Sequence, residues 1–279
     1  MRQLCIVCIA LSLCIAQPAA AQEAEAQYRM AVAERRAGHL DAALTAVREA
    51  IRLRPDHAAA HFTCGAILRQ QGHYDQALVE FRRVLELEPN SQEGHAMVGA
   101  SLVRLERWEE ALPELRRAVQ LLPTDVPSWG SLGIALRHLH RVDEAIQAYE
   151  QGLRSNTDNP DLLNNYAVAL RQAGRPEEAI GTLEGALARL PDDPNVNLNL
   201  AIAYRAAQRW PEATARYEHW LQLVPVPSDP GPLFDLGYCY EQLGRQDDAV
   251  RIYTRYQGLV RSDEAATTRV DDRLHGLGH

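Results

Sequence analysis

The side chains that could hold a metal ion gather near one point of the sequence. His57, His61 and Cys64 follow one another at i, i+4 and i+7, so one helical face would present three metal-type ligands. However, His57 falls at a turn between helices and Cys64 falls at an apolar core position. Packing and turn roles explain these residues better, and we predict no metal site.

A second pattern concerns nucleophilic catalysis. Residues 130–133 read Gly-Ser-Leu-Gly, which is part of the turn that exposes the serine nucleophile in some hydrolases. That turn follows a strand and needs glycine two residues before the serine, where this chain has Trp129. The pattern predicts a helix for this segment instead.

His138 and His140 flank a turn without a convincing third metal ligand. We therefore predict no catalytic residue and no cofactor, and a metal-dependent or hydrolytic enzyme is the weakest of three hypotheses.

The composition excludes further classes of function. The chain has 279 residues, 46% apolar and 24% charged, as in ordinary globular proteins. All 29 basic residues are arginine, which rules out Schiff-base lysines and the lysine of a phosphate-binding loop. The formal net charge of -8 argues against a nucleic-acid partner. No small-molecule substrate is expected either.

The first 21 residues have the pattern of an export signal. Arg2 precedes an apolar run over 4–16, and three alanines at 19–21 offer a cleavage site before Gln22. We predict a signal peptide over 1–21, no transmembrane segment in the mature chain, and a bacterial periplasmic or secreted location. A lipoprotein anchor is disfavoured because Leu13 stands where a small residue should precede Cys14.

The elements that would position any site come from an internal repeat of 34 residues. Prolines recur at this spacing at 55, 89, 123, 191 and 225. The predicted units are 24–57, 58–91, 92–125, 126–159, 160–193, 194–227 and 230–263, and we number positions from the first residue of each unit. Residues 264–279 form a capping helix and tail, with Val270 and Leu274 on its apolar face and Arg269 and Arg273 turned to water.

Small residues recur at two positions of the unit. Position 20 is alanine in every unit, and position 8 is always glycine or alanine, whereas position 24 is large and apolar. The apolar positions follow the helical period in two segments of each unit, separated by a turn that often contains glycine. Each unit is therefore predicted to be a helix hairpin whose two helices approach closely. Hairpins of this kind bury their apolar faces only by stacking on neighbours.

Small residues at position 8, alanine at 20, a large residue at 24 and proline at 32 resemble the tetratricopeptide repeat family. The resemblance covers the whole mature chain. It implies an all-α fold, a right-handed superhelical α-solenoid of seven helix-turn-helix repeats with a C-terminal capping helix. Because this array would separate Cys64 from Cys239, we expect both to be buried free thiols.

The resemblance also implies a concave groove lined by positions 2, 5, 9, 12 and 13 of the first helices. Position 12 is arginine in five units. These are Arg35, Arg69, Arg137, Arg171 and Arg205. No acidic residue lies three or four positions away on the same helix, so they form a candidate basic stripe for an acidic or carboxylate-bearing peptide. The alternative is that each arginine only complements the dipole at a helix C-terminus.

Amide and aromatic side chains complete the candidate groove. Asn165 and Asn199 occupy position 6 of consecutive units and could bond an extended peptide backbone, as in the repeat domain of O-linked N-acetylglucosamine transferases; the alternative is ordinary surface amides. The candidate apolar anchors, which could equally be groove filler, are Tyr28, Phe62, Phe234 and Tyr238.

These observations favour a non-catalytic scaffold that binds a peptide segment or a partner subunit in its groove. The second hypothesis is a structural subunit of a cell-envelope assembly, export or secretion machine that uses its convex or end surfaces. Charge reversal at Arg137 and Arg171 would separate the two, because only the first predicts loss of partner binding.

Overall fold

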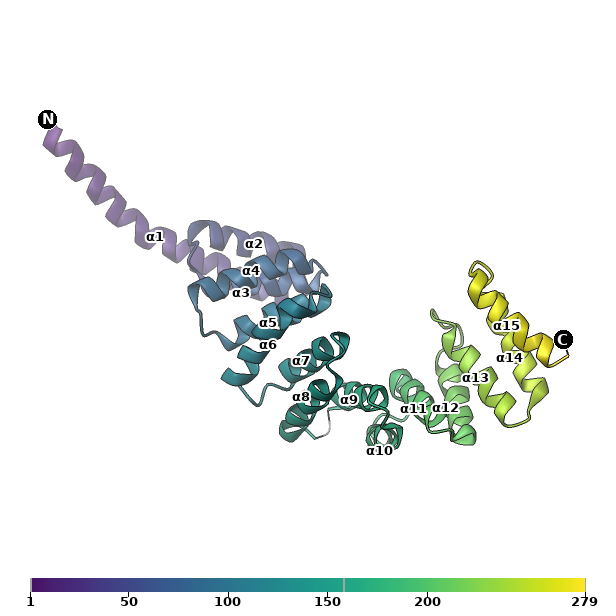
Figure 1. Ribbon diagram of the computed structural model, residues 1–279. Coiled ribbons are helices and arrows are strands. Elements are labelled where there is room, and N and C mark those ends of the chain that lie inside the picture. Colours follow the sequence, from purple (N-terminus) through teal and green to yellow (C-terminus); the bar gives the residue numbers. More distant parts are fainter. Residues whose placement is uncertain (1, 158, 279) are drawn as a thin grey trace. The chain divides into compact units, whose positions relative to one another are not determined.

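The computed structural model describes residues 2–157 and 159–278, with side chains from residue 19 onward. Over these ranges the chain forms fifteen helices and no strand (Figure 1). The prediction of an all-α fold is confirmed. The helices belong to two compact units, Met1–Leu139 and His140–His279, each with its own buried core.

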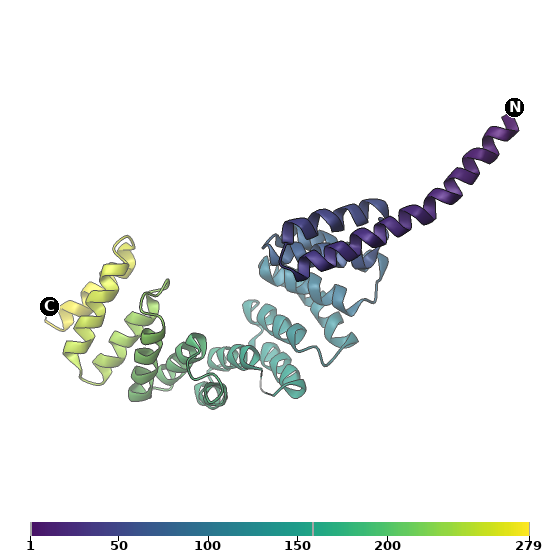
Figure 2. The same cartoon turned by 180° about the vertical axis from the view of Figure 1, so that it is seen from behind.

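The first unit contains seven helices. They are α1 (Arg2–Arg36), α2 (Leu40–Leu53), α3 (Ala58–Gln70), α4 (Tyr74–Leu87), α5 (Gln92–Arg104), α6 (Trp108–Leu121) and α7 (Val126–His138). Each odd-numbered helix up to α5 packs on the helix that follows it, and α2, α4 and α6 pack in turn on the next helix along the chain. The chain therefore folds as stacked hairpins, as Figure 2 also shows from behind.

The second unit continues the same pattern. Its helices are α8 (Val142–Ser155), α9 (Pro160–Gln172), α10 (Pro176–Leu187), α11 (Pro194–Ala206), α12 (Trp210–Leu223), α13 (Gly231–Gln242), α14 (Gln246–Leu259) and α15 (Glu264–Gly276). The hairpins are α9–α10, α11–α12 and α13–α14, and α15 packs on α14. Several first helices begin at the residue where the repeat pattern places the start of a unit, although the division into seven units remains our proposal.

Close contact between the two helices of a hairpin explains the small residues at position 8. A Cβ atom added to Gly65 would lie 2.7 Å from the Phe81 ring, and one added to Gly237 would lie 2.5 Å from the Tyr253 ring. Both distances are shorter than any van der Waals contact. The alanines at position 20 are fully buried in every predicted unit. Glycine and alanine therefore let a large side chain of the second helix reach the backbone of the first.

The turn within each hairpin requires a left-handed residue at position 15. Four turns use glycine, with φ between 70° and 83°. The other three place Glu106, His140 and Gln208 at φ of 57°, 59° and 60°. The sequence indicated only the glycines. The geometry of the turn imposes the same conformation on non-glycine residues, at a cost that packing must offset.

A recurring ion pair closes the start of the second helix. Arginine at position 16 donates to a carboxylate at position 19 at the start of α6, α8, α10, α12 and α14, with Nε–O distances of 2.6 to 3.0 Å. In the Arg107–Glu110 pair, for example, both guanidinium nitrogens reach the carboxylate. The arginine at the N-cap position therefore holds a carboxylate in the first turn of the second helix, where its negative charge also offsets the helix dipole.

The last helix behaves only partly as predicted. Val270 and Leu274 are buried, as expected of a cap. However, Arg269 is not simply turned to water, because its guanidinium lies 4.0 Å from the Phe234 ring centroid and donates to the Tyr256 hydroxyl. Arg273 likewise pairs with Glu241 at 3.1 Å. The long stems of arginine let both residues cover apolar surface while their charged groups find partners.

Within the described ranges, none of the helices combines the length and the apolar character needed to cross a bilayer. The predicted signal peptide, 1–21, lies mostly among residues whose side chains are outside the described part of the chain. It remains a prediction.

Candidate functional site

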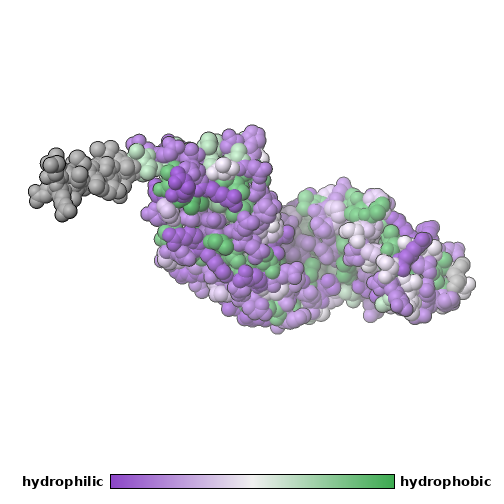
Figure 3. Space-filling model, turned by 90° about the horizontal axis from the view of Figure 1, so that it is seen from above, coloured by the Kyte–Doolittle hydropathy of each residue, from purple (hydrophilic) through white to green (hydrophobic). Residues whose placement is uncertain are grey.

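One face of the first helices stays partly exposed in both units. Position 8 is buried throughout, whereas the neighbouring position 9 is half-buried in every repeat and always apolar. These position 9 residues are Val32, Ala66, Ala100, Ile134, Val168, Ile202 and Tyr238. Positions 2, 12 and 13 beside them are half-buried or exposed. We call positions 2, 5, 9, 12 and 13 the first-helix face. In Figure 3 the surface is mostly hydrophilic and carries separate apolar patches.

In the first unit, two of the predicted groove arginines are unpaired. Arg69 is exposed and Arg35 is half-buried. Among the side chains that the structure describes, neither guanidinium has a hydrogen bond or an ion pair. Arg137 differs, because its Nη2 lies 3.1 Å from Nε2 of His138, whose ring stacks on Trp108 at 4.2 Å. Of the predicted groove arginines in this unit, Arg35 and Arg69 therefore remain available to a ligand.

In the second unit, Arg205 has a partner that its own helix does not supply. Its Nη2 lies 3.3 Å from Oδ2 of Asp235 on α13, the first helix of the next hairpin. The prediction considered only acidic neighbours on the same helix, so it did not include this partner on another helix. The Tyr217 hydroxyl also donates to Asp235, at 3.3 Å.

Three guanidinium groups influence this single carboxylate. Burial raises the pKa of Asp235, while Arg205, Arg269 and Arg171 act in the opposite direction. These three guanidinium groups, two from first helices and one from α15, favour the ionised form of Asp235. The Nε of Arg205 is buried and has no hydrogen-bond partner within the described residues.

The predicted asparagine pair is only partly available to a ligand. Asn199 on α11 donates to the Asn164 side chain on α9, at 2.8 Å, so its amide ties two first helices together. Asn165 is half-buried on the same helix as Asn164. The ladder that position 6 suggested is therefore interrupted by a bond between neighbouring hairpins.

The four aromatic candidates are half-buried and already in contact with other rings. Tyr28 lies 4.9 Å from the His57 ring and Phe62 lies 5.6 Å from Phe81. Phe234 contacts Tyr253 at 5.3 Å, and Tyr238 contacts Trp210 at 5.8 Å. Because α15 places arginines over Phe234 and Tyr238, those two present less free ring surface than Tyr28 and Phe62.

The metal-type residues are engaged in structural contacts. His61 Nδ1 lies 2.6 Å from Glu80, and its Nε2 lies 3.0 Å from the carbonyl oxygen of Pro55. Burial raises the pKa of the Cys64 thiol to about 12, which disfavours the thiolate that binds metals. Cys64 and Cys239 are buried free thiols, as expected. Within the described residues, no three potential ligands lie close enough together to hold a metal ion.

Position 4 has a structural role that sequence reasoning missed. His61, His95, Trp129 and Asn197 each contact the carbonyl oxygen of the proline that closes the preceding unit, at 2.8 to 3.1 Å. The signal was visible as a polar hydrogen-bond donor at the same position of several units, six residues after a proline.

Ser131 lies within α7, so the segment 130–133 is helical and cannot form a nucleophile turn.

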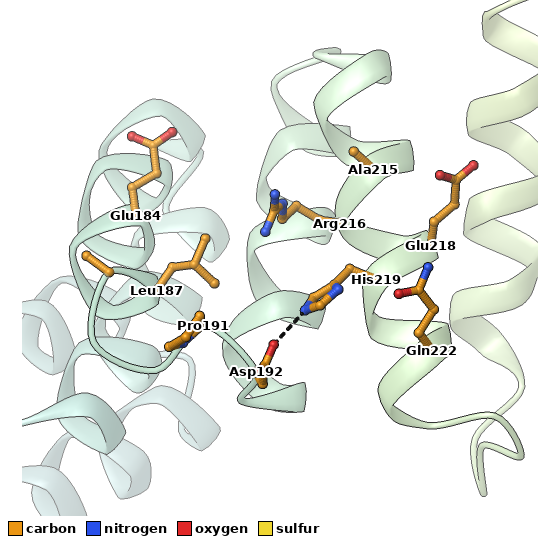
Figure 4. Close-up of a pocket in the computed structure, with 10 residues that line it drawn as sticks. Glu184, Leu187, Pro191, Asp192, Ala215, Arg216, Glu218, His219 and Gln222 are labelled. Carbon is orange, nitrogen blue, oxygen red and sulfur yellow. Dashed lines mark hydrogen bonds and ion pairs between the residues drawn. The ribbon is translucent and has the colours of Figure 1, made fainter.

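Outside the first-helix face, a hollow lies on the second helices of the second unit. It has a volume of about 700 Å³ and lies between α10 and α12. Figure 4 shows Glu184 and Leu187 on one side and Arg216 and His219 on the other, with His219 bonded to Asp192 at 3.1 Å. Its lining mixes both charges, so it favours no single class of ligand.

Family models match most of the chain. The model described as the C-terminal domain of cilia and flagella-associated protein 70 matches residues 9–229, and a tetratricopeptide repeat model matches residues 198–265. These matches agree with the stacked hairpins and with the small residues at their contacts. The chain belongs to the tetratricopeptide repeat family.

Solved tetratricopeptide repeat structures have the same fold. A tetratricopeptide repeat protein from Parabacteroides merdae is 16% identical, with a TM-score of 0.67 over 90% of this chain and 98% of its own. YrrB, a repeat protein described as having an unusual peptide-binding site, is 25% identical, with a TM-score of 0.54 over 61% of this chain and 88% of its own. MamA from Desulfovibrio magneticus is 20% identical, with a TM-score of 0.57 over 60% of this chain and 94% of its own. None of the curated proteins matches the chain.

Proposed function

We propose that this tetratricopeptide repeat protein is a non-catalytic scaffold that binds a peptide segment or a partner subunit on its first-helix face. The observation that carries the proposal is the exposure of that face: every repeat leaves an apolar position 9 half-buried beside polar and basic side chains. Apolar floors with a few polar groups are typical of binding surfaces. The peptide-binding site of YrrB gives independent support.

In the second unit, the proposed ligand is an acidic or carboxylate-bearing peptide. Arg171, Arg205 and Arg269 all favour the ionised form of the Asp235 carboxylate, and we place the carboxylate of a ligand within reach of the same guanidinium groups. Hydrogen bonds between guanidinium and carboxylate groups contribute about 1.5 to 3 kcal/mol each. Asn165, which lies on α9 six residues before Arg171, is half-buried and offers an amide to the peptide backbone.

Peptide selection tests this proposal. Peptides from a random display library would be selected on the immobilised protein, and their affinities measured by fluorescence anisotropy. We expect acidic sequences to be enriched, and Arg171→Gln/Arg205→Gln to weaken them about tenfold through loss of charge-assisted bonds. The matched control is Arg154→Gln/Arg261→Gln, which removes two exposed arginines elsewhere in the same unit. Absence of enrichment, or equal loss in both double variants, would contradict the proposal.

We also propose that the chain is exported, on the basis of the charged, apolar and small-residue segments within 1–21. N-terminal sequencing of protein recovered from the periplasm or the medium should then begin at Gln22. Protein that keeps Met1 and stays in the cytoplasm would overturn this part of the proposal.

The alternative function is a structural subunit of an envelope machine that binds through its second helices or ends. The hollow between α10 and α12 favours it, because this hollow lies outside the first-helix face. Substitution of Arg216 and His219 should abolish partner binding in that case and leave it unchanged if the first-helix face is the binding surface.

A further inference from the structure

Two adjacent hollows open on the first-helix face of the first unit. The first, of about 260 Å³, is lined by residues of α1, α3, α4 and the start of α5, including Tyr28, Ala59 and Val84. The second, of about 160 Å³, is lined by residues of α3, α5 and α7, including Ala96, Met97 and Ala100. Phe62 and Glu93 line both and therefore form the ridge between them.

The floors of the hollows are mostly apolar or small. Tyr28, Phe62 and Met97 are half-buried, so each contributes surface that water still reaches. Apolar surface of this kind gains free energy when a ligand side chain covers it. The division by Phe62 means that two separate apolar side chains would be accommodated better than one large group.

The charged residues that line the hollows are all acidic. Glu88 and Glu93 are exposed, and no hydrogen bond or ion pair from their side chains is present within the described residues. Asp125 lines the second hollow and accepts a hydrogen bond from Gln92 at 3.1 Å. Neither lining contains an arginine. A basic ligand would therefore find uncompensated carboxylates, whereas an acidic one would be repelled.

We propose that these two hollows bind a partner segment that presents two apolar side chains flanked by lysine or arginine. This site is distinct from the arginine cluster of the second unit and has the opposite charge. The protein would then select for partners with basic, apolar segments as well as for carboxylates, and its two units would recognise different chemical features.

The probe is a series of fluorescein-labelled peptides with two leucines, a Gly/Ser spacer of increasing length between them, and a lysine at each end. The matched series has glutamate in place of lysine. Binding to the full chain is measured by fluorescence anisotropy at low and high NaCl. We expect one spacer length to bind best, the glutamate series to bind at least about tenfold more weakly, and salt to weaken the lysine series.

Four variants locate the binding site. Glu88→Gln/Glu93→Gln should weaken the lysine peptide about tenfold, and Ala59→Arg should weaken it further by filling the first hollow with a cationic side chain. The control, Glu106→Gln/Glu109→Gln, removes two exposed carboxylates outside the hollows and should have little effect. Arg171→Gln/Arg205→Gln should leave binding of the lysine peptide intact. This variant therefore distinguishes failure of the two-hollow site from failure of the proposed carboxylate site.

Three outcomes would overturn the inference. One is absence of binding by every lysine peptide. Another is equal or tighter binding by the glutamate series. The third is binding that survives both Ala59→Arg and the loss of Glu88 and Glu93 while circular dichroism shows the variants to be folded.

Discussion

At the scale of single residues, the repeat pattern predicts the core better than the surface. Alanine at position 20 is fully buried in each predicted unit because only a small side chain fits where two helices cross. The repeat pattern did not predict that Asp235 pairs with Arg205 of the neighbouring hairpin. Spacing along one helix shows local ion pairs only, and this partner becomes visible only once position 12 of one unit is placed beside position 6 of the next.

Gly237→Ala tests the close approach at position 8. The added methyl group would meet the buried Tyr253 ring at 2.5 Å, so we expect a loss of about 1 to 3 kcal/mol and a lower melting temperature. Gly181→Ala in the same unit is the matched control. A Cβ there meets nothing within 4 Å, so alanine should stabilise α10 by about 0.5 to 1 kcal/mol. Equal melting temperatures for the two variants would refute the packing argument.

At the scale of elements, the sequence predicted hairpins, turns and the closing helix from periodicity and from proline and glycine. It did not predict that Glu106, His140 and Gln208 adopt left-handed conformations, because only glycine signals such a turn in advance. Nor did it place Arg269 on the Phe234 ring, since the contact depends on how α15 packs on its neighbours. A contact between two elements can be identified only from the three-dimensional structure, whereas the elements themselves follow from local sequence patterns.

Removal of residues 264–279 tests the capping role of α15. The deletion would uncover Tyr256, Val260 and one face of Phe234, which now lie beneath or beside the last helix. Exposed apolar end faces promote association of repeat proteins. We expect dimers or larger species by size-exclusion chromatography with light scattering, and a lower melting temperature. A truncated protein that remains monomeric and equally stable would show that α15 is not a cap.

At the scale of the whole molecule, both units present the same kind of face. Of the residues that first suggested a metal site, His61 bonds to Glu80 within its own hairpin and to the carbonyl oxygen of Pro55 before it, and Cys64 is buried. What each unit offers instead is an exposed first-helix face with an apolar floor. The chemistry of that face differs between the units: uncompensated carboxylates border it around Phe62, and guanidinium groups predominate around Asp235. The core repeat predicts the presence of such a face, but its ligand depends on the few residues that the fold leaves free to vary.

Hydrogen–deuterium exchange with a bound peptide tests the central claim most directly. The full chain would be measured alone and with a saturating peptide obtained by selection on the immobilised protein. If the first-helix face binds, amide protection should increase in α3 and α5 or in α9, α11 and α13, while α6, α10 and α12 remain unchanged. Increased protection confined to the second helices, around Arg216 and His219, would contradict the account.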